Sequence, residues 1–231
     1  MKLNRCGEKW AFTLTELLIT LLVLVVILWC VLPIFRPYHG APRIACQNNL
    51  KQDDLAFRLW AQDHNDKFPS QVSMTNEGAM EAAWKGDLPA VFRVMSNELN
   101  TPKILVCPSD RSRSFATNFS EEFSAANISY FFSLDATETN PAALLTGDAN
   151  LTGLSPVGDH TFELRLGETS CSWDRRRHVL HYEHQIFGYN YGPIGCGNVA
   201  LCDGSVQTLS NEQLEQAWLQ SGMSTNRLLM P

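Results

Sequence analysis

The chain has 231 residues, of which 45% are apolar and 18% are charged, and its net charge is −6. This length is typical of about one folded domain, and the 12 Phe and 6 Trp residues argue against a disordered chain. The excess of acid argues against a protein that holds nucleic acid by neutralising phosphates. A mean hydropathy of −0.14 excludes a protein with many membrane spans but leaves room for one.

The amino-terminal part contains an uncharged apolar run. Leu17–Leu32 reads LLITLLVLVVILWCVL, in which Thr20 is the only polar residue, and the run extends through 19 residues to Phe35. As a helix it would be roughly 28 Å long, close to the roughly 30 Å hydrocarbon core of a bilayer. A core helix of a soluble domain is apolar along one stripe only. The run therefore predicts one membrane span.

A polar leader, residues 1–11, precedes this run. It contains three bases, Lys2, Arg5 and Lys9, against one acid. The positive-inside bias favours a cytoplasmic amino terminus and an exterior carboxyl-terminal part, although three bases within residues 36–51 weaken this preference. The residues after the run lack the small-residue cleavage pattern of a secretory signal, so we expect the apolar helix to be retained.

Glu16 places a carboxylate at the start of the apolar run. Thr13-x-x-Glu16 matches a capping box, and an acid in the first turn suits the helix dipole. A charged side chain carried to the middle of a membrane costs about 2.5–3.5 kcal/mol. This cost favours a second interpretation, in which Glu16 pairs with a cation from another chain. The two interpretations are compatible, and both stay open here.

Phe12-Thr-Leu-Thr-Glu16-Leu-Leu, placed between the basic leader and the apolar run, resembles the class III signal of type IV pilins and type II secretion pseudopilins. The resemblance implies that a prepilin peptidase cleaves between Ala11 and Phe12 and that the new amino terminus of Phe12 is methylated. It also implies that Glu16 pairs with the methylated terminus of a neighbouring subunit. Pro33 lies where helices of this family carry a kinking proline. Ala11 replaces the usual glycine before the cut, so we expect slower processing.

The same resemblance implies a location and a set of partners. The protein would be a single-pass protein of the bacterial inner membrane, with a cytoplasmic amino terminus and a periplasmic head. Its partners would be the prepilin peptidase, other pilin or pseudopilin subunits that contact the apolar helix, and the inner-membrane assembly platform. It would be a structural subunit rather than an enzyme, with no cofactor and no nucleic-acid partner.

A second helix is predicted after the apolar run. Prolines and a glycine within residues 33–42 make a continuous helix there unfavourable, and we expect the helix to resume at Ile44 and to end near Asp63. Asp53 and Asp54 are expected away from its apolar face. The residues predicted to form that face are Cys46, Leu50, Phe57 and Trp60.

A small antiparallel sheet is predicted in the head, which makes the fold class α+β. The segments with the short apolar or alternating pattern of strands are 104–106, 128–134, 143–146 and 162–166. Asp203-Gly204 lies between two alternating runs and predicts a hairpin with a type I′ turn over 198–209. One or two short helices are expected within 79–99. Ser210-x-x-Gln213 is a capping box that predicts a helix ending at Gly222.

These patterns divide the chain into four parts. They are the leader peptide (1–11), the transmembrane or stalk helix (12–35), a joint with the second part of the stalk helix (36–66) and a periplasmic α+β head (67–231). Three segments of the exterior part resemble a large class of bacterial pseudopilin-like proteins: Cys46-Gln-Asn-Asn-Leu-Lys-Gln, Cys107-Pro-Ser-Asp and the Asp203-Gly204 hairpin. Members of that class often carry a histidine ten residues before this aspartate. Here Pro193 occupies that position, so no role of the histidine carries over.

Five cysteines lie in the exterior part: Cys46, Cys107, Cys171, Cys196 and Cys202. An oxidising periplasm permits disulfides, and an odd number leaves at least one thiol free or paired with another chain. We favour a Cys46–Cys107 disulfide, which would tie the second helix to the sheet. Buried free thiols are the alternative.

Two segments are candidates for metal binding. The residues that loosely match an EF-hand calcium loop are Asp148, Asn150, Thr152 and Asp159. Pro156 interrupts this match, and an Asx-rich turn is the simpler interpretation. The second candidate consists of His178, His181 and His184, whose spacing would suit a metal on a helix. A solvated loop or strand is the simpler interpretation of that stretch.

We therefore expect a pilin-like structural subunit that assembles into a pseudopilus of a type II secretion or type IV pilus-like system after cleavage by prepilin peptidase. The alternative is a single-pass, membrane-anchored periplasmic binding protein or enzyme that uses a prepilin-type targeting signal. A pocket with converging polar groups would favour the alternative, whereas an exposed apolar helix without such a pocket would favour the pilin-like subunit.

Overall fold

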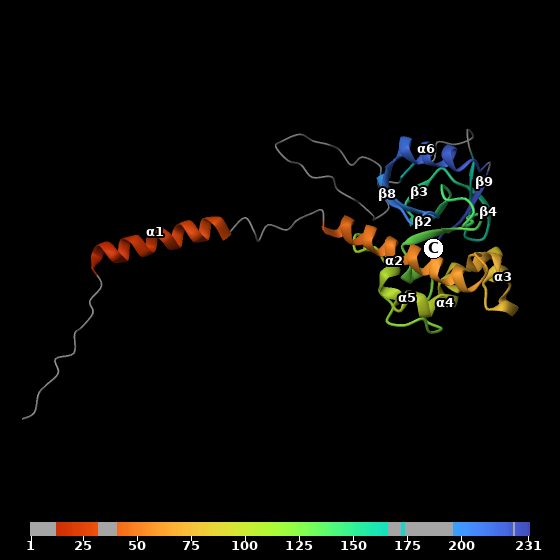
Figure 1. The fold of residues 1–231 in the computed structure, drawn as a ribbon, viewed down its shortest axis with the longest axis horizontal. Helices are drawn as coiled ribbons and strands as arrows, with labels where there is room; N and C mark the ends of the chain where they lie inside the picture. The colour runs from red at the N-terminus through yellow and green to blue at the C-terminus, as the bar shows by residue number, and fades with distance from the viewer. Residues whose placement is uncertain (1–12, 32–40, 166–171, 174–195, 224) are drawn as a thin grey trace, which may run out of the picture. The chain divides into compact units, whose positions relative to one another are not determined.

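The computed structural model describes residues 13–31, 41–165, 172–173, 196–223 and 225–231. The chain divides into two compact units, residues 1–38 and residues 39–231. The first contains helix α1 (Leu14–Val31), which covers most of the apolar run. The second, called the head below, combines helices with a seven-stranded antiparallel sheet, so the predicted α+β class is confirmed (Figure 1).

The helical segments of the head differ widely in length. Its α-helices are α2 (Ala41–Asp63), α3 (Met80–Trp84), α4 (Leu88–Val94), α5 (Ser96–Leu99) and α6 (Asn211–Ser221). Short 3₁₀ turns lie at Pro69–Gln71, Met74–Asn76, Pro102–Leu105 and Ala125–Asn127. The region 79–99 thus contains three short helices, and Gly86, with φ at +88°, separates the first two.

Helix α2 begins three residues earlier than predicted. Pro42 lies in its first turn, where the backbone N–H that a proline lacks would have no intrahelical acceptor, so the proline is tolerated. The four residues predicted to form the apolar face, Cys46, Leu50, Phe57 and Trp60, are all buried. The expected second part of a stalk is therefore a core helix of the head.

The main sheet has the strand order β4-β5-β9-β1-β2-β7-β8. Its strands are β1 (Tyr130–Ser133), β2 (Leu144–Asp148), β4 (Ser155–Gly158), β5 (Thr161–Arg165), β7 (Cys196–Leu201), β8 (Val206–Ser210) and β9 (Thr225–Leu229). A two-stranded sheet joins β3 (Leu151–Thr152) to β6 (Ser172–Trp173). Strands β3, β4, β6 and β9 were not predicted from the sequence. Strand β9 pairs with both β5 and β1, so the carboxyl-terminal segment forms an inner strand of the sheet.

Two local predictions are wrong. The short apolar run at 104–106 is not a strand, because Pro102–Leu105 forms a 3₁₀ turn whose start is capped by Thr101. A run of three apolar residues does not distinguish the two conformations. The hairpin between β7 and β8 does form, but of its two turn residues only Gly204 has a positive φ, at +89°. The turn is therefore the three-residue kind with a glycine bulge rather than type I′.

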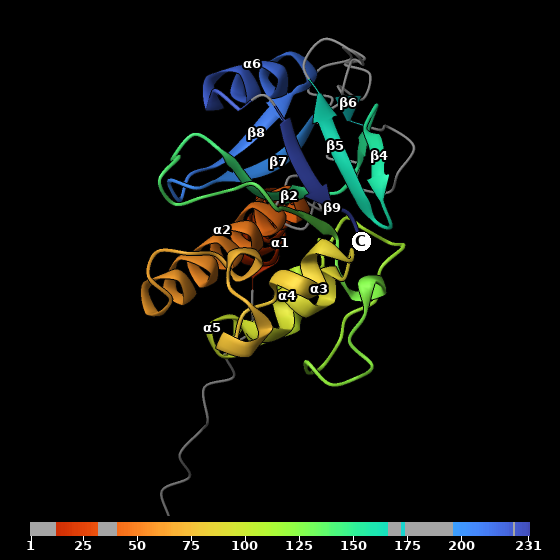
Figure 2. The same cartoon turned by 90° about the vertical axis from the view of Figure 1, so that its right-hand side faces the viewer.

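The head has three layers, with the sheet in the middle (Figure 2). Helices α2 to α5 cover one face, where Phe57 stacks on Phe132 of β1 with ring centroids 4.9 Å apart. Helix α6 covers the other face, where Trp218 packs with Phe131 in a second apolar cluster. The predicted capping box of α6 is confirmed, since Gln213 N donates to Ser210 Oγ and Gly222 ends the helix in a left-handed conformation.

Candidate functional site

Helix α1 is apolar on every side. Its 18 residues give a length of about 27 Å, and every residue from Leu14 to Val31 is exposed. The helix is long and apolar enough to cross a membrane. Burial of this apolar surface would be favourable, because each buried methylene would gain about 0.8 kcal/mol.

The first turn of α1 holds its carboxylate in a defined position. Thr13 N and Thr13 Oγ1 both donate to Glu16 Oε2 at 2.9 Å, and Glu16 N donates to Thr13 Oγ1 at 3.3 Å. The predicted capping box therefore forms. Both bonds that the carboxylate accepts use Oε2, so capping makes no use of Oε1.

Several predicted site residues lie outside the described residues, and their expectations stay predictions. They are Ala11 and Phe12 at the cleavage position, the kink residue Pro33, Cys171, Pro193, and the histidines His178, His181 and His184.

A disulfide joins Cys46 and Cys107, the pairing favoured by the sequence. The two Cα atoms lie 5.1 Å apart, and both residues are fully buried. The bond ties α2 to the segment that follows the 3₁₀ turn Pro102–Leu105, whereas we expected the partner to lie on a strand. Cys202 keeps its thiol, and burial raises the pKa of that thiol to about 12, so it is unreactive near neutral pH.

The segment proposed as a calcium loop does not form one loop. Asp148 is a fully buried residue of β2, and its Oδ2 accepts bonds from Asn198 N at 2.7 Å and Asn198 Nδ2 at 3.1 Å. Thr152 belongs to β3, and Asp159 lies in the turn between β4 and β5. Among the described residues, no group of three or more His, Cys, Asp or Glu is arranged to hold a metal ion. Asp148, Thr152 and Asp159 thus lie in different elements, and calcium binding stays a prediction.

Two buried acids lie between α2 and the sheet, where the sequence analysis expected none. Asp53 is 0% exposed and Asp54 is 3% exposed. Burial raises the pKa of Asp53 to about 8 and that of Asp54 to about 7. A signal was present in the sequence, because Asp53 follows Leu50 by three residues and precedes Phe57 by four, which places all three on one helix face. We nevertheless predicted that both residues would be exposed, because aspartate is usually exposed in proteins.

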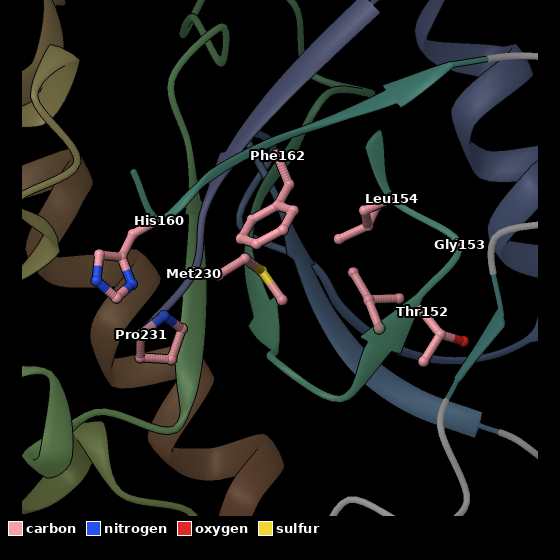
Figure 3. Close-up of a pocket in the computed structure, with 8 residues that line it drawn as sticks. Thr152, Gly153, Leu154, His160, Phe162, Met230 and Pro231 are labelled. Carbon is pink, nitrogen blue, oxygen red and sulfur yellow. The ribbon is translucent and has the colours of Figure 1, made fainter. Parts of the chain in front are cut away.

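The head also has a pocket beside β5 and the end of the chain, with a volume of about 310 Å³ (Figure 3). Phe162, Met230 and Leu154 point into it. The polar groups in its lining include Thr152 and His160, which lie at opposite ends in Figure 3. Polar groups that converge on one point are typical of a ligand site, and these two do not converge.

A cation–π contact connects α3 to the sheet. The Arg227 guanidinium on β9 lies 4.2 Å above the ring centroid of Trp84 and is hydrogen-bonded to Asp135 through Nε and Nη2. Asp135 also accepts from Arg227 N at 2.8 Å and raises the pKa of Arg227. Arg227 thus contacts both Trp84 and Asp135, and we interpret this group of contacts as structural.

Comparison with known proteins identifies no relative of this chain. No protein-family model matches the chain, and neither the curated proteins nor the solved structures contain a match.

Proposed function

We propose that this protein is a pilin-like structural subunit, tethered to the bacterial inner membrane by α1, with its head in the periplasm. In this proposal it assembles into a pseudopilus of a type II secretion or type IV pilus-like system after cleavage before Phe12. The observation that carries the proposal is a helix exposed and apolar on every side, with one carboxylate at its first turn.

Two surroundings suit such a helix, and the proposal uses both in succession. Lipid accounts for an apolar surface on every side before assembly. Identical helices packed in a filament account for it afterwards, since a helix that is hydrophobic all round is buried. Lipid alone leaves Glu16 unexplained beyond its capping role. A methylated amino terminus from a neighbouring subunit would supply the cation, and Glu16 Oε1 would be the oxygen that receives it.

The experiment separates capping from assembly. Glu16→Ala should leave membrane insertion intact and block incorporation into the filament, as measured by the amount of protein in sheared filament fractions. Thr13→Ala is the matched control, because it removes the hydroxyl part of the capping box while keeping the carboxylate, and it should still be incorporated. Equal incorporation of Glu16→Ala and the unmodified chain would overturn the pairing role.

Mass spectrometry tests the processing step independently. The mature protein should begin at a methylated Phe12, and an intact Met1 in membrane-extracted protein would overturn cleavage. The alternative of an anchored binding protein would rest on the pocket beside β5. It predicts a mature protein that stays monomeric in the membrane, together with a ligand that protects the Phe162 and Met230 side chains from chemical labelling.

A further inference from the structure

We propose that the packing of α2 on the sheet depends on pH, because Asp53 and Asp54 are neutral acids in this interface and their ionisation in alkaline medium loosens the helix. The Cys46–Cys107 disulfide keeps the beginning of α2 attached. The inference concerns the head alone and does not depend on filament assembly.

The position of Asp53 carries the argument. Its side chain is 0% exposed, and neither carboxyl oxygen accepts a hydrogen bond from the residues that the structure describes. The Thr146 hydroxyl of β2 lies beside it and lowers its pKa, but this hydroxyl donates to the Phe131 carbonyl oxygen at 2.8 Å. An ionised carboxylate there would lack a donor, whereas a neutral acid has a proton of its own to give to Thr146 Oγ1.

Asp54 is buried at the next contact between α2 and the sheet, against the β7–β8 hairpin. A Cβ atom built on Gly204 would lie 3.4 Å from Asp54 Oδ2 and 2.6 Å from Arg58 Nη1, so the bare turn lets the hairpin approach the helix closely. Asp54 Oδ1 has no hydrogen-bond partner among the described residues. Both neighbouring acids therefore lie in the interface, and each has an oxygen that its surroundings leave unsatisfied.

The charged and titratable groups around the pair do not provide a compensating cation for Asp53. Asp54 on the same helix raises the pKa of Asp53, and Asp53, Asp148 and Asp110 raise the pKa of Tyr130 on β1. None of these groups is a cation, so none of them offsets a negative charge on Asp53.

For Asp54 the surroundings are mixed. Arg58 favours the charged form, whereas Asp203 and Glu138 disfavour it, and the Cys202 thiol lies close by. Arg58 is shared, since its Nε lies 3.7 Å from Glu138 Oε1 and its Nη1 is 3.5 Å from the Asp203 carbonyl oxygen. The guanidinium therefore has two other acceptors, and desolvation remains the largest effect on Asp54.

The sign of the pH effect follows from these positions. Burial raises the pKa of Asp53 from 3.8 to about 8, so the docked helix holds a proton that the undocked helix releases through most of this interval. The docked state is therefore favoured at low pH and loses stability as the pH rises toward about 8. Asp54 acts in the same direction up to about pH 7.

Hydrogen exchange of the full chain in detergent micelles tests the proposal. Protection of the α2 amides around Asp53, expressed relative to the exchange rate of an unstructured chain at each pH, should fall by at least tenfold per pH unit from about pH 6 to about pH 7 and more gently up to about pH 8, because opening releases the protons of Asp54 and Asp53 in the lower range and that of Asp53 in the upper. Asp53→Asn, which keeps the shape but does not titrate, should reduce this slope. Asp63→Asn changes an exposed acid at the end of the same helix and should leave the slope unchanged.

A slope of zero in the unmodified chain, or an unchanged slope in Asp53→Asn, would overturn the proposal. Infrared difference spectroscopy of the unmodified chain gives an answer even if Asp53→Asn does not fold. A protonated carboxyl band should be present at about pH 6 and lost by about pH 9. The absence of that band at the lower pH would also overturn the proposal.

Discussion

Helices α1 and α2 have 18 and 23 residues, but they differ in what their side chains contact. Helix α1 is almost entirely apolar, and none of its residues is buried. Helix α2 has a more polar sequence, but one of its faces is buried against the sheet and includes two carboxylates. The comparison teaches that burial depends on the surface that faces a helix. The partner of α2 is the sheet of the head, whereas the proposed partners of α1 are lipid and other subunits.

Truncating the aromatic centre of the α2 interface should have the largest effect. Phe57→Ala should lower the free energy of unfolding of the head by about 3–5 kcal/mol, because it removes a fully buried ring and leaves a cavity. Urea unfolding of the full chain in detergent micelles measures this. Leu59→Ala, on the exposed side of the same helix, should change it by less than about 0.5 kcal/mol. Equal losses would contradict the interface described here.

Removing the disulfide should weaken the attachment of α2 at its beginning. The double change Cys46→Ser and Cys107→Ser opens a loop whose ends are 61 residues apart and should cost about 2–4 kcal/mol. The same urea titration measures the loss. Cys30→Ser, in α1, is the control and should leave the unfolding of the head unchanged. A head as stable as the unmodified one would show that the bond adds no constraint.

Placing one charge on each helix sharpens the comparison. Leu24→Lys, near the middle of α1, should reduce membrane insertion by about 2.5–3.5 kcal/mol if α1 spans the bilayer. Leu55→Lys, on the exposed side of α2, should be tolerated because that face contacts water. The fraction of each variant that resists alkaline extraction from membranes measures the difference. Full retention of Leu24→Lys would argue against a span.

The smallest effect concerns a helix cap. Ser210→Ala should destabilise the head by about 1 kcal/mol, because the first turn of α6 loses the acceptor for Gln213 N. Ser210→Asp keeps an acceptor at the same place and should restore most of the stability. Thermal unfolding monitored by tryptophan fluorescence, to which Trp218 of α6 contributes, provides the measurement. An unchanged midpoint in Ser210→Ala would show that the cap is dispensable.

Predictions from short-range patterns agreed best with the structure. The helix at α1, the caps of α1 and α6, and the apolar face of α2 all depend on residues within a few positions of one another. The hairpin at Asp203-Gly204 was placed correctly, but its turn type was wrong, because a glycine also suits the left-handed last position of a three-residue turn. Strand β9 was missed because its pairing with β1 brings together residues almost 100 positions apart, such as Phe132 and Leu229.

The amino-acid sequence alone determined that this protein has one apolar helix with an acid at its start and an α+β part beyond it. These features depend on composition and on the spacing of neighbouring residues, so they can be predicted from the sequence. Only the tertiary structure decided that α2 belongs to the head, that the tail fills the middle of the sheet, and that Asp53 and Asp54 are buried. These outcomes depend on contacts between distant segments, and the free energy of burying a carboxylate depends on the groups that those contacts bring beside it.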